Sequence, residues 1–539
     1  MIPAINKKLL SFFLIIALFI SACNTVEKKE TQKPIPVESK EKSIVEGSFN
    51  AASGISFDSA QIQKFLNEKP LFKEFRKEFD TFYRANNYHY VWYDNSGLVP
   101  TSGALISSIE NVGSEGVSAD ILYKDTLEQM LHNSVNLVNS GPDINMELML
   151  TAQYFYYSKN IWAGSLNNKA ESINWYLPRK KLSYTSLLTD NLSSGLIEHR
   201  SGPIAAMQYD GLKKALALYR NIDKNGDEIR VPLLTKNIRL KLNQSSTVIP
   251  FLRTRLQQLG DIQNTDSSDV YDAALAGVVQ IVKQRYGLKP DSLLTNEFIN
   301  EINVSAKKRA EQIMVNMERF RWIPADSVSN EFILVNIPEY TLHYFEDRKS
   351  VWSSNVVVGK PMNKTVIFSG KMRYVVFSPY WNIPTSIINK EIKPGMKKNP
   401  NYLQNHNMEW NGGNVRQKPG PRNSLGLVKF LFPNSNAIYL HDTPSKSLFN
   451  EDNRAFSHGC IRVEKPKDLA IRILKQLPGW TPEKIDAAMH RGKEQTVTLK
   501  KLIPVYIGYF TAFIDKDGQL NFRKDIYNRD GRLLQMLQQ

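Results

Sequence analysis

The pattern of apolar residues changes at about residue 330, and this change constrains the fold more than any other feature of the chain. Before it, apolar side chains recur every three or four residues, as in Phe72, Phe75 and Phe79, which is the period of an amphipathic helix. After it, short runs rich in β-branched and aromatic residues alternate with turn residues. These runs are Phe332–Ile337, Thr341–Phe345, Val356–Val358, Tyr374–Phe377 and Ala437–Leu440. We therefore predict a multidomain α+β protein with a helical N-terminal region and a mainly β C-terminal domain.

At roughly 100–200 residues per domain, a chain of 539 residues is expected to form two to four domains. We predict a helical scaffold domain over residues 56–245 and a β-rich domain over residues 325–500. Residues 501–539 are expected to add strands that complete the β-rich domain. The basis is Asp515-Lys516-Asp517-Gly518, a hairpin signal between two β-prone segments.

Residues 246–305 read as a compact unit of three helices between these domains. The first helix ends in Leu252-x-x-x-Leu256-x-x-Leu259-Gly260-Asp261, and the second ends in Tyr286-Gly287-Leu288-x-x-Asp291. The third begins at about Thr295. These motifs resemble the three-helix peptidoglycan-binding domain of cell-wall enzymes, although Ser292 stands where that family usually has Gly. A helical bundle without a ligand is the alternative.

The N-terminus has the features of a secretory signal. Two lysines precede the apolar run Leu9–Ile20, which is shorter than the about 20 residues of a spanning helix. The ending Ile20-Ser21-Ala22-Cys23 resembles a bacterial lipobox, which implies that Cys23 receives lipid. We predict a signal peptide over residues 1–22 and a flexible tether over residues 23–55. An uncleaved anchor with an incidental cysteine is the alternative.

Charge and cysteine content limit the possible partners and cofactors. The 69 Lys and Arg residues exceed the 53 Asp and Glu residues and give a net charge of +16, which favours an anionic partner or reflects a solvated surface. Two cysteines exclude a disulfide scaffold and a Cys₄ metal site. The histidines lack metal-ligand spacing, and no phosphate loop or dinucleotide fingerprint occurs. We therefore predict no metal and no nucleic acid partner.

The second cysteine, Cys460, lies in the motif Ser457-His458-Gly459-Cys460, and His441 lies 19 residues before it. A cysteine reacts as its thiolate, whereas a free thiol has a pKa of about 8.5. A nearby imidazole can take the thiol proton and later return it to a leaving amine, and both histidines are candidates. Gly459 permits a tight turn, which is expected to leave the Cys460 N–H and its neighbours facing an oxyanion.

This arrangement resembles the YkuD-like L,D-transpeptidase catalytic domain, whose signature is a histidine, a spacer and then Ser/Thr-His-Gly-Cys. The resemblance implies that Cys460 is the nucleophile and His441 the general base, with its ring oriented by a backbone carbonyl. It implies that His458 shapes the loop or hydrogen-bonds near the oxyanion. The family signature continues with Asn at the position of Arg462. Arg462 either holds a substrate carboxylate or is a surface residue.

The resemblance extends from about residue 330 to the C-terminus and is to the large multidomain branch of the family. The motifs that carry it are Tyr380-Trp381-Asn382-Ile383-Pro384, Pro419-Gly420-Pro421-Arg422-Asn423-Ser424-Leu425-Gly426 and Tyr439-Leu440-His441-Asp442-Thr443-Pro444. Residues 388–417, rich in Asn and Lys, correspond to a flap over the active site. Ser457, Tyr380 and Trp381 are candidates for substrate binding, and core packing explains the two aromatic residues equally well.

The family resemblance implies a lipid-anchored enzyme that cross-links peptidoglycan stem peptides through a Cys460 thioester, with release of D-Ala. Peptidoglycan is then both donor and acceptor, and no cofactor is required because thiolate, base and oxyanion donors suffice. The thioester can also pass to water or to a protein lysine, and a non-catalytic wall-binding lipoprotein is a further alternative. We expect a periplasm-facing location, and Asn24 after Cys23 favours the outer membrane over the inner one.

Overall fold

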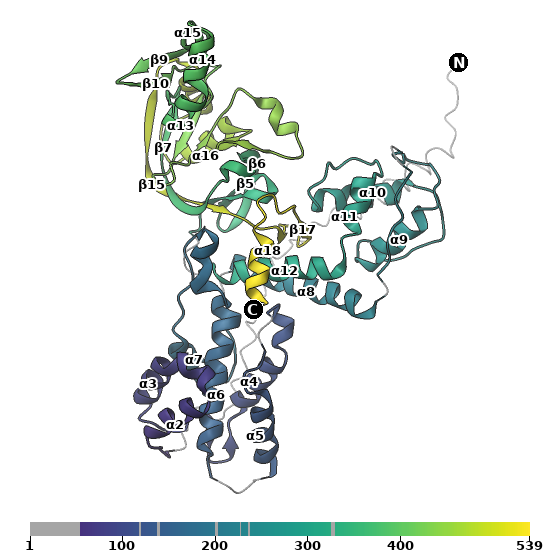
Figure 1. The fold of residues 1–539 in the computed structure, drawn as a ribbon, viewed down its shortest axis with the longest axis vertical. Coiled ribbons are helices and arrows are strands. Elements are labelled where there is room, and N and C mark those ends of the chain that lie inside the picture. The colour runs from purple at the N-terminus through teal and green to yellow at the C-terminus, as the bar shows by residue number, and fades with distance from the viewer. Residues whose placement is uncertain are drawn as a thin grey trace, which may run out of the picture. The chain divides into compact units, whose positions relative to one another are not determined.

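The computed structural model describes residues 54–117, 120–136, 141–199, 203–226, 228–235, 238–324 and 329–538 (Figure 1). The predicted signal peptide, Cys23 and nearly all of the predicted tether lie outside these residues. Within these ranges no helix is long and apolar enough to cross a membrane. No group of acidic, histidine and cysteine side chains in the same ranges is arranged to hold a metal ion.

The N-terminal region is helical, as the sequence predicted, and it has its own hydrophobic core, to which the predicted stripe of Phe72, Phe75, Phe79 and Phe82 contributes. Its helices are α2 (Ala60–Glu68), α3 (Arg76–Ala85), α4 (Pro100–Glu110), α5 (Lys124–Asn136), α6 (Ile144–Tyr157), α7 (Tyr184–Ser194) and α8 (Pro203–Asn225). Short 3₁₀ or π turns are η1 (Pro70–Phe75), η2 (Val112–Glu115), η3 (Ser158–Gly164) and η4 (Asn167–Ile173). Three two-residue strands are β1 (Tyr93–Asp94), β2 (Gly97–Leu98) and β3 (Trp175–Tyr176).

Three helices follow where the sequence predicted them: α9 (Ile249–Gln258), α10 (Ala273–Arg285) and α11 (Asn296–Ile302). Asp272 and Thr295 cap the N-termini of α10 and α11 with their side chains, which satisfies backbone N–H groups that the helices leave open. Helix α12 (Ala306–Arg321) comes next and packs along α8. The apolar side chains of this part join the same core as the C-terminal sheet.

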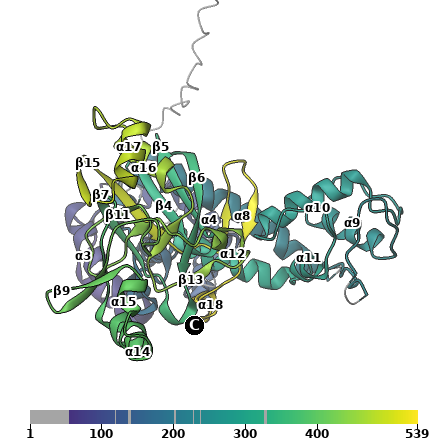
Figure 2. The same cartoon turned by 90° about the horizontal axis from the view of Figure 1, so that it is seen from above.

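The C-terminal domain is built on a ten-stranded mixed sheet (Figure 2). Its strands are β4 (Phe332–Asn336), β5 (Thr341–Glu346), β6 (Lys349–Gly359), β7 (Ile367–Phe377), β11 (Val428–Leu431), β12 (Leu440–His441), β13 (Ala455–Ser457), β14 (Ile461–Val463) and β15 (Gln495–Gly508), joined by β3. The pairings run in the order β11-β12-β14-β6-β5-β4-β15-β7, and β7 pairs with β11 again. The strands therefore form a closed circuit around an apolar interior.

Helices and short turns complete this domain. They are α16 (Pro466–Leu474), α17 (Pro482–His490), η5 (Ile337–Glu339), η6 (Pro361–Asn363) and η8 (Lys446–Asn450). One face of α16 is apolar, with Leu469, Ile473 and Leu474 fully buried in the core. The same core also receives Ile485 of α17.

The predicted flap, residues 388–417, belongs to a small substructure with its own sheet and apolar cluster. The elements are β8 (Trp381–Asn382), α13 (Thr385–Ile387), η7 (Ile388–Ile392), α14 (Lys393–Lys398), α15 (Tyr402–Asn405), β9 (Met408–Asn411) and β10 (Asn414–Gln417). Strands β8, β10 and β9 form a three-stranded sheet. Ile383, Ile388, Ile392 and Val415 form the core of this substructure.

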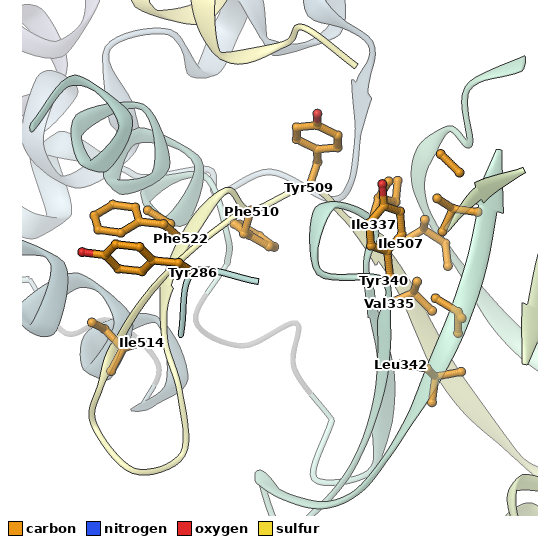
Figure 3. Close-up of a cluster of buried hydrophobic side chains, with 14 of the residues drawn as sticks. Tyr286, Val335, Ile337, Tyr340, Leu342, Ile507, Tyr509, Phe510, Ile514 and Phe522 are labelled. Atoms are coloured by element: carbon orange, nitrogen blue, oxygen red, sulfur yellow. The ribbon is translucent and has the colours of Figure 1, made fainter. Parts of the chain in front are cut away.

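Residues 501–539 were predicted to add strands that complete the β-rich domain. Strand β15 does so, but β16 (Ala512–Ile514) and β17 (Leu520–Phe522) form a separate hairpin, followed by α18 (Asp530–Leu537). Figure 3 shows the transition, where Tyr509 and Phe510 follow β15 and Phe522 lies beside Tyr286. The hairpin contacts α8, α10 and α12, so the apolar strand residues are buried against helices instead.

Candidate active site

Cys460 lies in a tight loop between β13 and β14. Gly459 has a φ of +121°, a backbone conformation that favours glycine. Within the loop, Ser457 Oγ donates to the Cys460 carbonyl at 2.5 Å and accepts from the Gly459 N–H at 3.1 Å. Strand β14 then pairs with β12 and β6, so the cysteine is held at the beginning of a central strand.

Ser457 contributes to the structure of the loop, and its binding of substrate stays a prediction. The residue is 2% exposed, and its single hydroxyl proton is already donated within the loop. The Gly459 N–H donates to Ser457 Oγ, so it does not face an oxyanion as the sequence suggested. The Cys460 N–H, by contrast, donates to no acceptor within the described residues and remains available.

His441 ends β12, and a backbone carbonyl orients its ring, as the family resemblance implied. Nδ1 donates to the Asp442 carbonyl at 2.5 Å, and the ring also hydrogen-bonds with the Leu425 backbone. The Asp442 carboxylate is occupied elsewhere, because it accepts hydrogen bonds from two backbone N–H groups and from Lys446 Nζ. Backbone groups therefore fix the orientation of the imidazole ring.

A row of three side chains, of which Lys429 and Arg462 are cationic, crosses the sheet beside Cys460. Lys429 of β11 pairs with His441, and His441 pairs with Arg462 of β14. Because paired residues on neighbouring strands project to one face, all three side chains share that face. Arg462 Nε is buried and has no hydrogen-bond partner among the described residues, so the guanidinium keeps a donor for an anion. This partial burial argues against the alternative that Arg462 is an ordinary surface residue.

Sequence reasoning missed Lys429, although the run Val428-Lys429-Phe430 alternates as a strand with one polar face. The missing information was the strand pairing, which places this lysine opposite His441. Lys429 Nζ also contacts the Tyr380 carbonyl at 3.3 Å and Glu494 at 3.8 Å.

Burial sets the charge of both reacting groups. It lowers the pKa of His441 to about 3, and the positive charge of Arg462 acts in the same direction. Burial also raises the pKa of the Cys460 thiol, although hydrogen bonds from Tyr439 and the charge of Arg462 oppose that shift. At neutral pH the resting pair is therefore a neutral thiol and a neutral imidazole.

Tyr439 contacts both reacting groups and was not singled out from the sequence. Its ring centroid lies 5.6 Å from that of His441, and its side chain hydrogen-bonds with those of Cys460 and Trp381. The signal was present, because residues two apart on a strand share a face, which groups Tyr439 with His441. Trp381 also packs against the flap's apolar cluster, so it joins the flap to the site.

Tyr380 lies at the base of the flap. The Arg416 guanidinium stacks 4.1 Å from its ring centroid, and the Tyr380 N–H donates to Glu494 at 2.8 Å. These contacts pack Tyr380 against β10, and its binding of substrate stays a prediction.

His458 faces the flap. Its Nε2 lies 3.3 Å from Glu391 Oε1 in η7, and both side chains are about half exposed. The contact ties the cysteine loop to the flap. Which of the two roles implied for His458 it performs, shaping the loop or hydrogen-bonding near the oxyanion, stays a prediction.

Cys460, His441 and an open backbone N–H thus lie on neighbouring strands of a closed mixed sheet. Residues 330–495 match the model of the YkuD family, described as the L,D-transpeptidase catalytic domain. Residues 77–216 match a second model, described as a scaffold domain.

A protein of Haemophilus influenzae named as a putative L,D-transpeptidase is 34% identical over 296 residues. The match covers 51% of this chain and 58% of that relative, so the chain spans little more than half of the relative's length. Solved L,D-transpeptidase structures also match at low identity. That from Xylanimonas cellulosilytica is 11% identical with a TM-score of 0.19, covering 51% of this chain and 100% of that one. That from Stackebrandtia nassauensis is 13% identical with a TM-score of 0.20, covering 50% and 95%.

Proposed function

We propose that this protein is an L,D-transpeptidase that cross-links peptidoglycan stem peptides through a thioester on Cys460. The observation that carries the proposal is His441, whose Nδ1 is fixed by the Asp442 carbonyl on a strand that pairs with the strand following Cys460. The two cations in the row of side chains support an anionic substrate, because stem peptides carry several carboxylates. Arg462 and Lys429 are the residues proposed to hold these groups.

The reaction begins from the neutral pair. As Cys460 Sγ attacks the carbonyl between diaminopimelate and D-Ala, its proton passes to His441 Nε2, and the Cys460 N–H donates to the developing oxyanion. When the tetrahedral intermediate collapses, the C–N bond breaks and D-Ala leaves with the proton from His441. An amine of a second stem then attacks the thioester, gives its proton to His441 and releases the thiol. Atoms and charges balance without a cofactor.

The same thioester allows other outcomes. Water in place of the amine gives a carboxypeptidase or endopeptidase, and a protein lysine gives a wall-attached protein. The flap contacts at His458 and Trp381 control access to the thioester, so they bear on which acceptor enters. A non-catalytic wall-binding lipoprotein is disfavoured because the orientation of His441 has no evident packing purpose.

We further propose that helices α9–α11 bind peptidoglycan and that a lipid on Cys23 anchors the protein in the bacterial envelope, facing the periplasm. The outer membrane is the preferred site. The support is the three-helix motif and the lipobox-like N-terminus.

The decisive experiment is chromatographic and mass-spectrometric analysis of cell walls incubated with purified protein lacking residues 1–22. Dimers linked diaminopimelate to diaminopimelate are expected, and Cys460→Ala is the matched control that should yield none. Trimmed monomers alone would support the hydrolase. No change in the wall relative to Cys460→Ala would contradict catalysis.

A further inference from the structure

We propose that Thr365 is a positioning residue that aims the Cys460 N–H at the oxyanion, a role that rests on the proposed acyl transfer. Thr365 lies between η6 and β7, far from the cysteine motif in sequence, and it is fully buried. Nothing in the motif itself identifies it.

The Thr365 hydroxyl bridges two backbone segments beneath the cysteine loop. Oγ1 donates to the Gly459 carbonyl at 2.9 Å and accepts from the Gly359 N–H, also at 2.9 Å. The hydroxyl therefore donates its one proton to a backbone carbonyl and uses one of its two lone pairs to accept from a backbone N–H. A hydroxyl used in this way fixes the orientation of the peptide that it contacts.

That peptide joins Gly459 to Cys460. In a planar trans peptide the C=O and the following N–H point in opposite directions. Because the Gly459 carbonyl is held toward buried Thr365, the Cys460 N–H points away from it, toward the side from which substrate approaches. This is the N–H that has no acceptor among the described residues.

The bond to Thr365 matters because the loop contains a glycine. Gly459 has no Cβ, so the backbone on either side can rotate more freely than at other residues. Ser457 fixes the peptide before Gly459 by accepting its N–H, but it does not fix the peptide after it. Thr365 supplies that second restraint.

Thr365 is itself held by the C-terminal segment. Tyr527, which is 1% exposed, donates its hydroxyl proton to the Gly359 carbonyl at 2.5 Å and accepts from the Thr365 N–H at 3.2 Å. The Tyr527 N–H in turn donates to the hydroxyl of Tyr509, which Figure 3 shows after β15.

Gly359 has no space for a side chain in this arrangement. A Cβ there would lie 2.1 Å from the Asn363 carbonyl, so the turn from Gly359 to Thr365 closes tightly. The restraint on the cysteine loop therefore depends on tight backbone packing as well as on hydrogen bonds.

The test compares two reactions of the same thiol in the purified protein lacking residues 1–22. Acylation by imipenem develops an oxyanion, whereas alkylation by iodoacetamide does not. Thr365→Val keeps the shape and removes both hydroxyl hydrogen bonds. We expect it to slow acylation by about 10–100-fold, less than or equal to the loss of a whole oxyanion donor. Alkylation and its pH profile should stay within about twofold of wild type, since proton transfer to His441 is untouched.

Two control variants test whether the effect comes from the Thr365 hydroxyl. Thr365→Ser keeps the hydroxyl and should restore acylation to near the wild-type rate, and Thr498→Val makes the same chemical change at an exposed position of β15. Should Thr365→Val fail to fold, Tyr527→Phe removes the supporting hydroxyl, and we expect acylation to fall in the same selective way.

Unchanged acylation in Thr365→Val, or an equal fall in both reactions, would overturn the positioning role and leave the proposed function intact. A wild-type protein that alkylates but is not acylated would instead overturn the proposed function, and the role of Thr365 with it.

Discussion

The protonation of His441 determines how the site responds to pH. Its pKa of about 3 in the folded chain lies below the value of about 6.5 for a free histidine. The imidazole thus stays neutral and able to accept a proton well below pH 6. The same shift has a stability cost, because the unfolded chain gains a proton below about pH 6.5 that the folded chain does not. Stability is therefore expected to fall as pH drops from 6.5 toward 3.

We predict that His441→Ala slows acylation by imipenem roughly 10²–10⁴-fold at pH 7, the usual range for positioned acid–base catalysis. High pH should partly restore the rate, because hydroxide then generates the thiolate directly. Since burial raises the pKa of Cys460, this rescue is expected only above the ordinary thiol value of about 8.5. Intact-protein mass spectrometry over a pH series measures the rates, with circular dichroism to check folding.

His458→Ala is the comparison within this experiment. It should lower activity with little rescue at high pH, because the side chain supports the loop and contacts Glu391. Glu391→Gln weakens the same contact while keeping the histidine, so it should reproduce part of the loss. If His458→Ala were rescued by pH and His441→Ala stayed fast, the two roles would have to be exchanged.

The sequence predicted roles for Cys460, His441 and Arg462 because their motif is contiguous or regularly spaced. It could not predict that the Ser457 hydroxyl donates within its own loop, since a linear motif does not show which way a hydroxyl points. Thr365 could not be predicted at all, because its contact with Gly459 depends on two turns that meet only in the folded chain.

Among the elements, α9–α11 were predictable because each helix carries local start and stop signals. The structure adds that two acids of the motif that resembles a peptidoglycan-binding domain form ion pairs within the unit. Asp261 pairs with Arg285, and Asp291 pairs with Lys283. These motif residues therefore stabilise the fold, and exposed side chains must supply any contact with the wall. Phe251 of α9 and Ile281 of α10 are large apolar side chains that are exposed.

We predict that Phe251→Ser combined with Ile281→Ser weakens co-sedimentation with purified peptidoglycan by about 30-fold. Burying half of an apolar side chain contributes about 1 kcal/mol, and about 1.4 kcal/mol is a tenfold change in affinity. Wild-type binding should persist in part at high salt, because apolar contacts are screened less than surface charges. Val351→Ser, at an exposed apolar position of β6, is the matched control. Equal binding by all three proteins would reduce α9–α11 to a spacer.

The strands were predictable one by one, but their pairing was not. β-rich runs mark β4–β7 and β12 in the sequence, whereas closure of the sheet depends on β7 pairing with both β15 and β11. The hairpin after residue 511 illustrates the same limit. The local sequence predicts its turn. The helices against which it packs depend on long-range contacts, such as the hydrogen bonds between the Gln208 side chain and the Ile514 backbone, about 300 residues apart.

At the scale of the whole molecule, strand pairing, an ion pair and a hydrogen bond connect the helical region to the C-terminal domain. Strand β3, from the helical region, pairs with β7 and extends the catalytic sheet. Arg319 of α12 forms an ion pair with Asp530 of α18 at 2.7 Å, and Arg529 donates to the Ile173 carbonyl at 2.9 Å. The segment that holds Thr365 through Tyr527 is thus anchored on the helices.

The chain has two cysteines, and the proposed lipidation would leave Cys460 without an intramolecular disulfide partner. We predict that Cys23→Ser abolishes incorporation of radiolabelled palmitate in a bacterial host and leaves the protein either uncleaved or soluble. The reason is that lipoprotein processing requires the thiol at the residue after the cleavage site. Cys460→Ser is the matched control, since it removes the other thiol and should keep the label and the membrane fractionation. Label that persists in Cys23→Ser but disappears in Cys460→Ser would place the lipid on the wrong cysteine for this proposal. Membrane fractionation of Cys23→Ser identical to wild type, with no label in either protein, would show instead that another segment holds the chain at the membrane.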